Sequence, residues 1–202
     1  MTFVPGIEGY ERSVQRFVES SQALDFAEVC RDFLDHLPLL PGRVLDAGAG
    51  AGQNAAAIAK MGHLVVAIEP MADFLAAARA TYANLPVTWI DDSLPKLQQL
   101  GSAPAQFDFI LVDGVWHHLD EAARSRAISR FAFLLKPGGK CALSLRNGPA
   151  GMGTCIYPTD ASCTLKQAQA CGLECVFRLE NQPSIFSHKK NVTWSRLVLL
   201  KP

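Results

Sequence analysis

Three glycines at every second position, just after an acidic residue, are the strongest indication of chemistry in this chain. An apolar run leads into Asp46, and Gly48, Gly50 and Gly52 follow, before an alanine-rich stretch at 54–61. Glycine lets a chain turn sharply and lets a ligand touch backbone atoms, because no Cβ blocks either. The first N–H groups of a helix in the alanine-rich stretch would point at the same ligand. We therefore predict a strand, a ligand-binding turn and a helix.

The residues around these glycines indicate the charge of the ligand. The dinucleotide-binding turn needs a third glycine where this chain has Gln53. Asp46, at the end of the strand, would repel a pyrophosphate but suits a ligand that carries an ammonium group. The pattern therefore favours a cationic ligand over a dinucleotide.

The elements that must position this turn follow from the periodicity of apolar residues. Short apolar runs alternate with helical patterns, which predicts a mainly parallel α/β sheet. We expect strands at 43–46, 64–68, 87–90, 107–112 and 140–146. We expect helices at 54–61, 71–83, near 96–100 and at 119–135. In the last helix, apolar residues at helical spacing predict a buried face, made of Ile128, Phe131 and Leu135. Arginines between them predict a solvated face, made of Arg124, Arg126 and Arg130.

The two ends of the chain complete one predicted domain, residues 1–202. A helix at 165–171 precedes strands at 173–180 and 193–200, and no crossover helix fits between these strands. The last two strands should therefore pair antiparallel. Two helices, at 9–18 and 24–37, form a predicted cap (1–38) on the α/β core (39–202).

Acidic residues end four successive predicted strands. These are Asp46, Glu69, the pair Asp91–Asp92, and Asp113. Ligands of open α/β sheets bind beyond the carboxyl ends of the strands, and clustered carboxylates repel one another. A bound cation with several hydroxyl groups would explain the cluster.

These features together resemble class I S-adenosylmethionine-dependent methyltransferases, most closely over residues 39–146. Segments at 91–95, 146–149 and 194–197 also look like an uncharacterised bacterial branch of small-molecule type. The resemblance implies a doubly wound, seven-stranded, mostly parallel Rossmann-like sheet with an antiparallel last strand. It implies S-adenosylmethionine as the cofactor, which carries an ammonium, a sulfonium, a ribose diol and an adenine amino group.

The resemblance also assigns roles to the strand-end residues. Glu69 matches the acid that binds both ribose hydroxyls, and Asp92 matches the acid at the adenine amino group. Asp46 and Asp113 match residues at the methionine part. The implied cofactor-binding residues are Asp46, Ala47, Gly48, Gly50, Glu69, Pro70, Met71, Asp92, Ser93, Leu94, Asp113 and Gly114. Asp92 can also cap the short helix that follows it. Met71 either sandwiches the adenine with Leu94 or belongs to the core.

Three residues are candidates for chemistry on the acceptor. His117 and His118 follow the fourth strand, where either can remove a proton from an acceptor hydroxyl or amine. The alternative for each is a helix cap or a packed, hydrogen-bonded imidazole. Arg146 ends the fifth strand and can bind a carboxylate or phosphate of the acceptor. The alternative is an ion pair with Asp113 or Glu69.

Composition limits the partners of the chain. Nineteen basic and nineteen acidic residues give zero net charge, which argues against a nucleic-acid or anionic-membrane surface. We find no transmembrane run and no targeting leader. The six cysteines have no zinc-site spacing, so we expect no metal and free, mostly buried thiols in the cytoplasm.

The predicted function is methyl transfer to a small acceptor, possibly an acidic one. The cap and the 146–164 loop are both short, so they offer little surface for a protein or a duplex. A non-catalytic methyltransferase-like partner subunit is the alternative, although such proteins usually lose the glycine turn or the ribose acid. A nicotinamide-linked reductase would need the third glycine. The pattern leaves the oligomeric state and the identity of the acceptor open.

Overall fold

Seven strands of the described residues form one sheet, in the order β3-β2-β1-β4-β5-β7-β6. The structure is a computed structural model that describes residues 4, 6–186 and 189–202. The strands are β1 (Arg43–Ala47), β2 (Leu64–Ile68), β3 (Val87–Ile90), β4 (Phe107–Val112), β5 (Leu135–Asn147), β6 (Glu174–Pro183) and β7 (Thr193–Leu200). β7 runs antiparallel to both of its neighbours, and the other pairs are parallel. The sheet confirms the predicted fold class.

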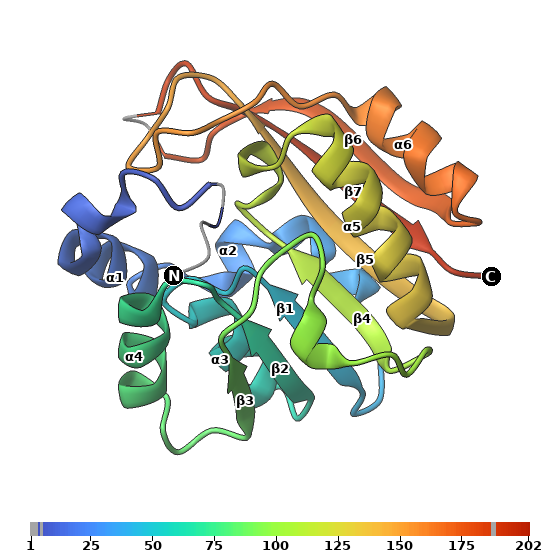
Figure 1. Ribbon diagram of the computed structural model, residues 1–202, viewed down its shortest axis with the longest axis horizontal. Helices are drawn as coiled ribbons and strands as arrows, with labels where there is room; N and C mark the ends of the chain where they lie inside the picture. The colour runs from blue at the N-terminus through green and yellow to red at the C-terminus, as the bar shows by residue number, and fades with distance from the viewer. Residues whose placement is uncertain (1–3, 5, 187–188) are drawn as a thin grey trace.

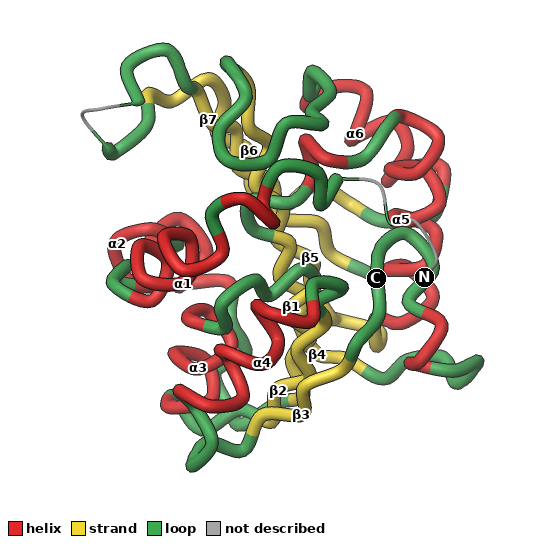
Figure 2. The backbone as a smooth tube through the Cα atoms, turned by 60° about the vertical axis from the view of Figure 1, so that its left-hand side comes forward, coloured by secondary structure: helices red, strands yellow, loops and turns green. Residues whose placement is uncertain are grey.

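Helices cover both faces of the sheet. They are α1 (Val14–Gln22), α2 (Phe26–Val29), α3 (Gln53–Lys60), α4 (Ala72–Thr81), α5 (Glu121–Leu134) and α6 (Ala161–Ala170). Short 3-10 helices are η1 (Tyr10–Arg12), η2 (Arg31–His36), η3 (Gln98–Leu100) and η4 (Trp116–His118). Figure 2 shows α1 to α4 on one side of the sheet and α5 and α6 on the other. Two apolar cores fill the space between helices and sheet, one on each face.

The cap packs over the carboxyl ends of the central strands. The backbone N–H of Thr154 donates to the carbonyl of Glu8 (2.8 Å), which joins the first segment of the chain to the long loop after β5. Figure 1 shows this N-terminal segment, in blue, beside the sheet edge where the strand ends lie. The two predicted cap helices are each divided, since η1 precedes α1 and η2 follows α2. Residues 1–3 and 5 of the cap lie outside the described part.

The prediction for the last crossover helix was wrong at its start. Helix α6 begins at Ala161, four residues before the predicted position. Asp160 is its N-cap, because the Asp160 carboxylate accepts the N–H of Cys163 (2.5 Å). The cap therefore nucleates the helix earlier than the apolar periodicity indicates.

The solvated face predicted for α5 also needs correction at Arg124. This side chain is buried, and its guanidinium donates to the carbonyls of Trp116 (3.1 Å), Pro158 (2.8 Å) and Tyr157 (3.3 Å). Arg124 therefore connects η4 to the loop that contains Tyr157 and Pro158, and the periodicity of one helix cannot reveal such distant partners. Ile128, Phe131 and Leu135 are buried as predicted, but Leu135 belongs to β5 and not to the helix.

The cysteines differ in part from the sequence-based expectation. All six thiols are free, but only Cys30 and Cys141 are buried, so the expectation of mostly buried thiols was wrong. The described residues contain no helix that is long and apolar enough to cross a bilayer. They also contain no cluster of three or more acidic, histidine or cysteine side chains suited to a metal ion.

Candidate cofactor and acceptor site

The glycine turn lies between β1 and α3, at the carboxyl end of the sheet. Gly48 and Gly50 have φ values of +86° and +54°, which favour glycine over residues with a Cβ. The N–H groups of Gly48 and Ala49 both donate to the carbonyl of Ile68 at the end of β2 (2.9 and 2.8 Å). A Cβ on Gly50 would stand 3.3 Å from the ring of Phe17 in α1. The turn is therefore a close-approach position under the cap.

Glu69 fastens this turn to the start of α4. Its carboxylate accepts the N–H of Gly50 (2.9 Å) with one oxygen and the N–H of Met71 (2.8 Å) with the other. The side chain is buried, and burial raises the pKa of Glu69 to about 7, although the two N–H groups oppose the rise. A carboxylate has about four acceptor positions, so Glu69 retains capacity to accept hydroxyl groups.

Asp46 and Asp113 form a pair of acids beside the turn. Asp46 is buried, and no described residue gives its Oδ2 a hydrogen-bond partner. Burial first and the Asp113 charge second raise the pKa of Asp46 to about 8. Asp113 accepts from the Asn54 amide (3.4 Å) in the first turn of α3. The backbone N–H of Ala55 opposes the rise in the pKa of Asp46, so only one oxygen of this buried acid lacks a partner. That oxygen, next to a second acid, is a site that a ligand cation would satisfy.

Asp92 and its neighbours occupy the loop after β3. The Asp92 carboxylate accepts the N–H of Ser93 (2.8 Å) and of Gln99 in η3 (2.7 Å). Asp92 therefore satisfies one N–H of η3, although the N-cap residue of that helix is Leu97. The adenine contact stays a prediction that is compatible with this bond. Asp91 is exposed. Met71 and Leu94 are both buried, and Leu94 packs in the larger core.

The remaining predicted cofactor residues lie at the ends of the central strands. Ala47 is the last residue of β1 and is fully buried, and Pro70 is half-buried behind Glu69. The N–H of Gly114 donates to Ser144 Oγ on β5 (2.7 Å). Taken together, the unpartnered Asp46 oxygen, the glycine turn and the Glu69 carboxylate fit a ligand with an ammonium group and vicinal hydroxyls.

His118 belongs to a hydrogen-bonded chain that begins in the cap. Its Nδ1 lies 2.8 Å from the carbonyl of Cys155, and its Nε2 lies 3.1 Å from the hydroxyl of Tyr10. A carbonyl only accepts, so Nδ1 carries the proton and Nε2 accepts the Tyr10 O–H. Burial lowers the pKa of His118. The neutral imidazole is therefore a candidate base whose accessible nitrogen faces the tyrosine.

His117 is the weaker candidate base of the two histidines. It is buried, its ring centroid lies 4.1 Å from that of His118, and its Nδ1 has no partner within the described part of the chain. Burial, followed by the charges of His118 and Arg146, lowers the pKa of His117 to about 2. Its geometry matches the packed-imidazole alternative.

Arg146, near the end of β5, has no acidic partner among the described residues. Its Nη2 donates to the carbonyl of Pro149 (2.6 Å), while its Nη1 is buried and makes no hydrogen bond to a described residue. None of the ion pairs among the described residues involves Arg146, so pairing with Asp113 or Glu69 is not observed. Burial lowers the pKa of Arg146, and the nearby Tyr10 opposes the effect.

Sequence reasoning expected the cap to cover an acceptor but named none of its individual residues. Tyr10 and Phe17 come from the cap, and Phe17 stacks on Phe74 of α4 with centroids 4.4 Å apart. The Tyr10 ring meets Phe17 edge-on at 5.1 Å and Phe74 at 5.8 Å. Lys189 was missed as well, and burial and the Arg146 charge lower its pKa. These residues stand far apart in the sequence, and no local pattern connects them.

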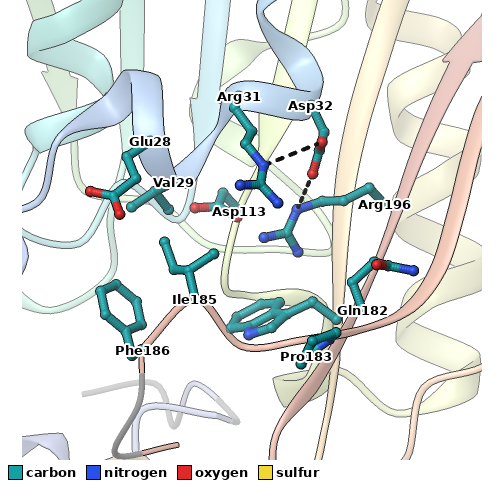
Figure 3. Close-up of a pocket in the computed structure, with 11 residues that line it drawn as sticks. Glu28, Val29, Arg31, Asp32, Asp113, Gln182, Pro183, Ile185, Phe186 and Arg196 are labelled. Atoms are coloured by element: carbon teal, nitrogen blue, oxygen red, sulfur yellow. Dashed lines mark ion pairs between the residues drawn. The ribbon is translucent and has the colours of Figure 1, made fainter.

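A small cavity lies beside the pair of acids, and sequence reasoning did not anticipate it. Its volume is about 50 Å³, and Asp113 lies on its wall together with Arg31, Asp32 and Arg196. Figure 3 shows these side chains, with residues of α2 and η2 on one side and Ile185, from the link between β6 and β7, on the other.

Comparisons with known proteins agree with this geometry. Residues 44–139 match the model of a family described as a methyltransferase domain. An uncharacterised methyltransferase of Mycobacterium bovis is 33% identical over 120 residues, which make up 55% of this chain and 57% of that protein. The chain thus covers little more than half the length of this relative.

Two solved structures share the fold over nearly the whole chain. A TehB-like S-adenosylmethionine-dependent methyltransferase of Corynebacterium glutamicum has a TM-score of 0.69 at 21% identity, covering 95% of this chain and 97% of that one. The 1,6-didemethyltoxoflavin-N1-methyltransferase of Burkholderia thailandensis, solved with its substrate and S-adenosylhomocysteine, has a TM-score of 0.72 at 21% identity. The match covers 96% of this chain and 84% of that protein's chain.

The sheet order and the glycine turn define a class I methyltransferase fold. Residues 44–139 match a methyltransferase domain, and the chain as a whole has the fold of class I S-adenosylmethionine-dependent methyltransferases.

Proposed function

We propose that this protein transfers a methyl group from S-adenosylmethionine to a small acceptor that carries an acidic group. The observation that carries the cofactor assignment is the buried pair Glu69 and Asp46 on either side of the glycine turn. One acid has spare acceptor capacity and the other has an unpartnered oxygen. When bound, the cofactor supplies an electrophilic methyl on its sulfonium.

Different residues of the chain bind different parts of the cofactor. Glu69 accepts the ribose hydroxyls, and the pair Asp46 and Asp113 balances the positive charge of the methionine part. Asp92 and the Ser93 backbone read the adenine amino group, and Met71 and Leu94 contact the adenine faces. Methyl transfer from a sulfonium is a direct displacement, so the chief task of the protein is to align the reacting atoms.

Arg146 and Lys189 support an anionic acceptor. Arg146 keeps an unpartnered Nη1 among the described residues. Burial and then the Arg146 charge lower the pKa of Lys189, whose ammonium lies 4.9 Å from the ring centroid of Phe186. A guanidinium without an acidic partner among the described residues suits a carboxylate or a phosphate. The bond between the Thr154 N–H and the Glu8 carbonyl joins the cap to the loop after β5, and this connection supports a small acceptor.

His118 is the residue we assign to the acceptor proton, acting through Tyr10. The Tyr10 oxygen can take a proton from the acceptor while its own proton passes to His118 Nε2. The resulting imidazolium keeps its Nδ1–H bond to the Cys155 carbonyl. An acceptor atom that bears no proton, such as a carboxylate oxygen or a tertiary amine, needs no such step.

Ligand-induced stabilisation separates this function from its alternatives. A ligand at 100 times its dissociation constant stabilises the folded state by about 2.7 kcal/mol. We expect S-adenosylmethionine and S-adenosylhomocysteine to raise the Tm and NAD(P) to leave it unchanged. A response to NAD(P) alone would support a reductase. No response to any of them would support a non-catalytic partner subunit.

Substitution of Arg146 tests the acidic acceptor. Arg146→Ala should leave affinity for S-adenosylhomocysteine within about twofold of wild type, since Arg146 contacts none of the proposed cofactor residues. Turnover of acceptors found in a metabolite screen should fall, and Arg146→Lys should recover it only in part, because lysine cannot make a two-pronged contact. Loss of cofactor affinity in the alanine variant would instead show that Arg146 supports the cofactor site.

A further inference from the structure

The cavity beside Asp113 contains a largely enclosed arginine, Arg196, whose N–H groups are only partly hydrogen-bonded to the described residues. Arg196 lies on β7, its side chain is only 11% exposed, and its Nε and Nη1 make no hydrogen bond to any described residue. The nearest acid, Asp32, stands 4.0 Å from Nε, beyond hydrogen-bonding distance. Burying a guanidinium in this way is costly unless something completes its hydrogen bonds.

Aromatic rings hold this guanidinium in place. The Arg196 guanidinium carbon lies 4.9 Å from the ring centroid of Trp194 and 5.8 Å from that of Phe33. Asp32 is shared with Arg31, whose Nε lies 3.7 Å from its other oxygen. The Arg196 fork is therefore oriented before any ligand arrives, and its free N–H groups border a cavity in which Asp113 lies (Figure 3).

Asp113 connects this cavity to the glycine turn. Its carboxylate accepts from Asn54, in the first turn of the helix that follows the turn, and it raises the pKa of Asp46. A cation of Arg196 and an anion of Asp113 thus line one cavity next to the cofactor cradle. Its volume of about 50 Å³ is several times the 10–15 Å³ that one water needs. This arrangement complements a group that bears a carboxylate and an ammonium on one carbon.

We propose that Arg196 binds the carboxylate of the cofactor's methionine part, with Asp113 at its ammonium. This inference rests on the proposed function, because it places the amino-acid end of S-adenosylmethionine in the cavity. Arg146 is then left for the acceptor. The two arginines lie on neighbouring, paired strands, Arg146 on β5 and Arg196 on β7. Arg146 is the register partner of Trp194.

The test compares two ligands that differ at the amino-acid end. S-adenosylhomocysteine has the carboxylate and the ammonium, whereas 5′-methylthioadenosine has the adenosine and the sulfur without either. Calorimetric titration of both ligands would be made with wild type, Arg196→Gln and Arg196→Lys. Arg178→Gln is the matched control, since Arg178 lies on the neighbouring strand and contacts Glu180 and Ser162 instead.

We expect Arg196→Gln to weaken S-adenosylhomocysteine about tenfold to hundredfold, the range for one charge-assisted hydrogen bond. Affinity for 5′-methylthioadenosine should change less than about twofold, Arg196→Lys should be intermediate, and the control should match wild type. Equal weakening of both ligands, or of neither, would overturn the assignment. If Arg196→Gln does not fold, the lysine variant decides, because its charge is kept and only the fork is lost.

Failure of the proposed function would look different. Wild-type protein that binds neither ligand would refute the cofactor assignment itself. Wild-type protein that binds both ligands equally would keep the adenosine site and refute the role of Arg196.

Discussion

Replacing Glu69 by glutamine tests the ribose contact and its ionisation together. Glutamine keeps one acceptor oxygen but places an NH2 where the second oxygen meets a backbone N–H. The two N–H donors, of Gly50 and Met71, already use one oxygen each. At least one ribose hydroxyl therefore loses its charged acceptor. A hydrogen bond to a charged group is worth about 1.5–3 kcal/mol, or about 10-fold to 150-fold in affinity.

The pH dependence of this loss follows from the raised pKa of Glu69. With a pKa of about 7, Glu69 is mostly protonated at pH 6 and mostly ionised at pH 8. The ionised fraction changes about tenfold across this interval, and only the ionised form accepts from both hydroxyls. The affinity ratio of wild type to Glu69→Gln should therefore be about tenfold larger at pH 8. Titration of Asp46 cancels in this ratio except for the contribution of the Glu69 charge to its pKa, which is smaller than those of burial and Asp113.

Calorimetry with S-adenosylhomocysteine at pH 6 and pH 8 measures this ratio. Circular dichroism at both pH values verifies that the variant is folded. Glu180→Gln is a suitable control, since Glu180 pairs with Arg178 on β6, and its ratio should stay near one. A Glu69→Gln ratio that is the same at both pH values, or near one at pH 8, would refute the ribose assignment.

Three further outcomes are expected. Gly50→Val should abolish binding of S-adenosylhomocysteine in calorimetry, because φ is +54° and the new side chain would meet the ring of Phe17; normal binding would exclude the turn as the cofactor cradle. Arg124→Ala should cost about 3 kcal/mol of unfolding free energy, and lower the Tm by about 6–12 °C, since three carbonyls lose a charged donor; an unchanged Tm in calorimetric scans would contradict this. The ligand-free protein should lose stability as pH rises from about 6.5 to 8, because Glu69 and Asp46 have raised pKa values of about 7 and 8 and the unfolded chain has already released both protons. Denaturant titrations that show rising stability over this interval would disagree.

Local signals predicted most of the sheet. Strands β2, β3, β4 and β7 have the predicted limits, since an apolar run between turn residues is a property of neighbouring residues. β5 is longer than predicted, because Leu135 pairs with Phe107 across a register shift that only the neighbouring strand creates. The start of α6 had a local signal in Asp160, which apolar spacing alone does not reveal.

The residues of the candidate site likewise fall into those that local sequence could predict and those that it could not. Glycines and strand-end acids could be identified from the sequence, because parallel strands bring their carboxyl ends to one edge whatever the loops do. Tyr10 and His118 are 108 residues apart, and no spacing rule relates them. Arg124 was assigned to the wrong face, since its partners lie in loops that fold over the helix.

The sequence by itself determined the fold class, the glycine turn and the acids at the strand ends, because periodicity and turn chemistry are local. Only the tertiary structure decided which charges remain without partners. Arg146 and Arg196 look alike as isolated arginines in strands, but burial and the distances to acids leave free N–H groups on both within the described residues. Burial and pairing are properties of distant segments packed together, which is why the acceptor side was the least predictable part of this protein.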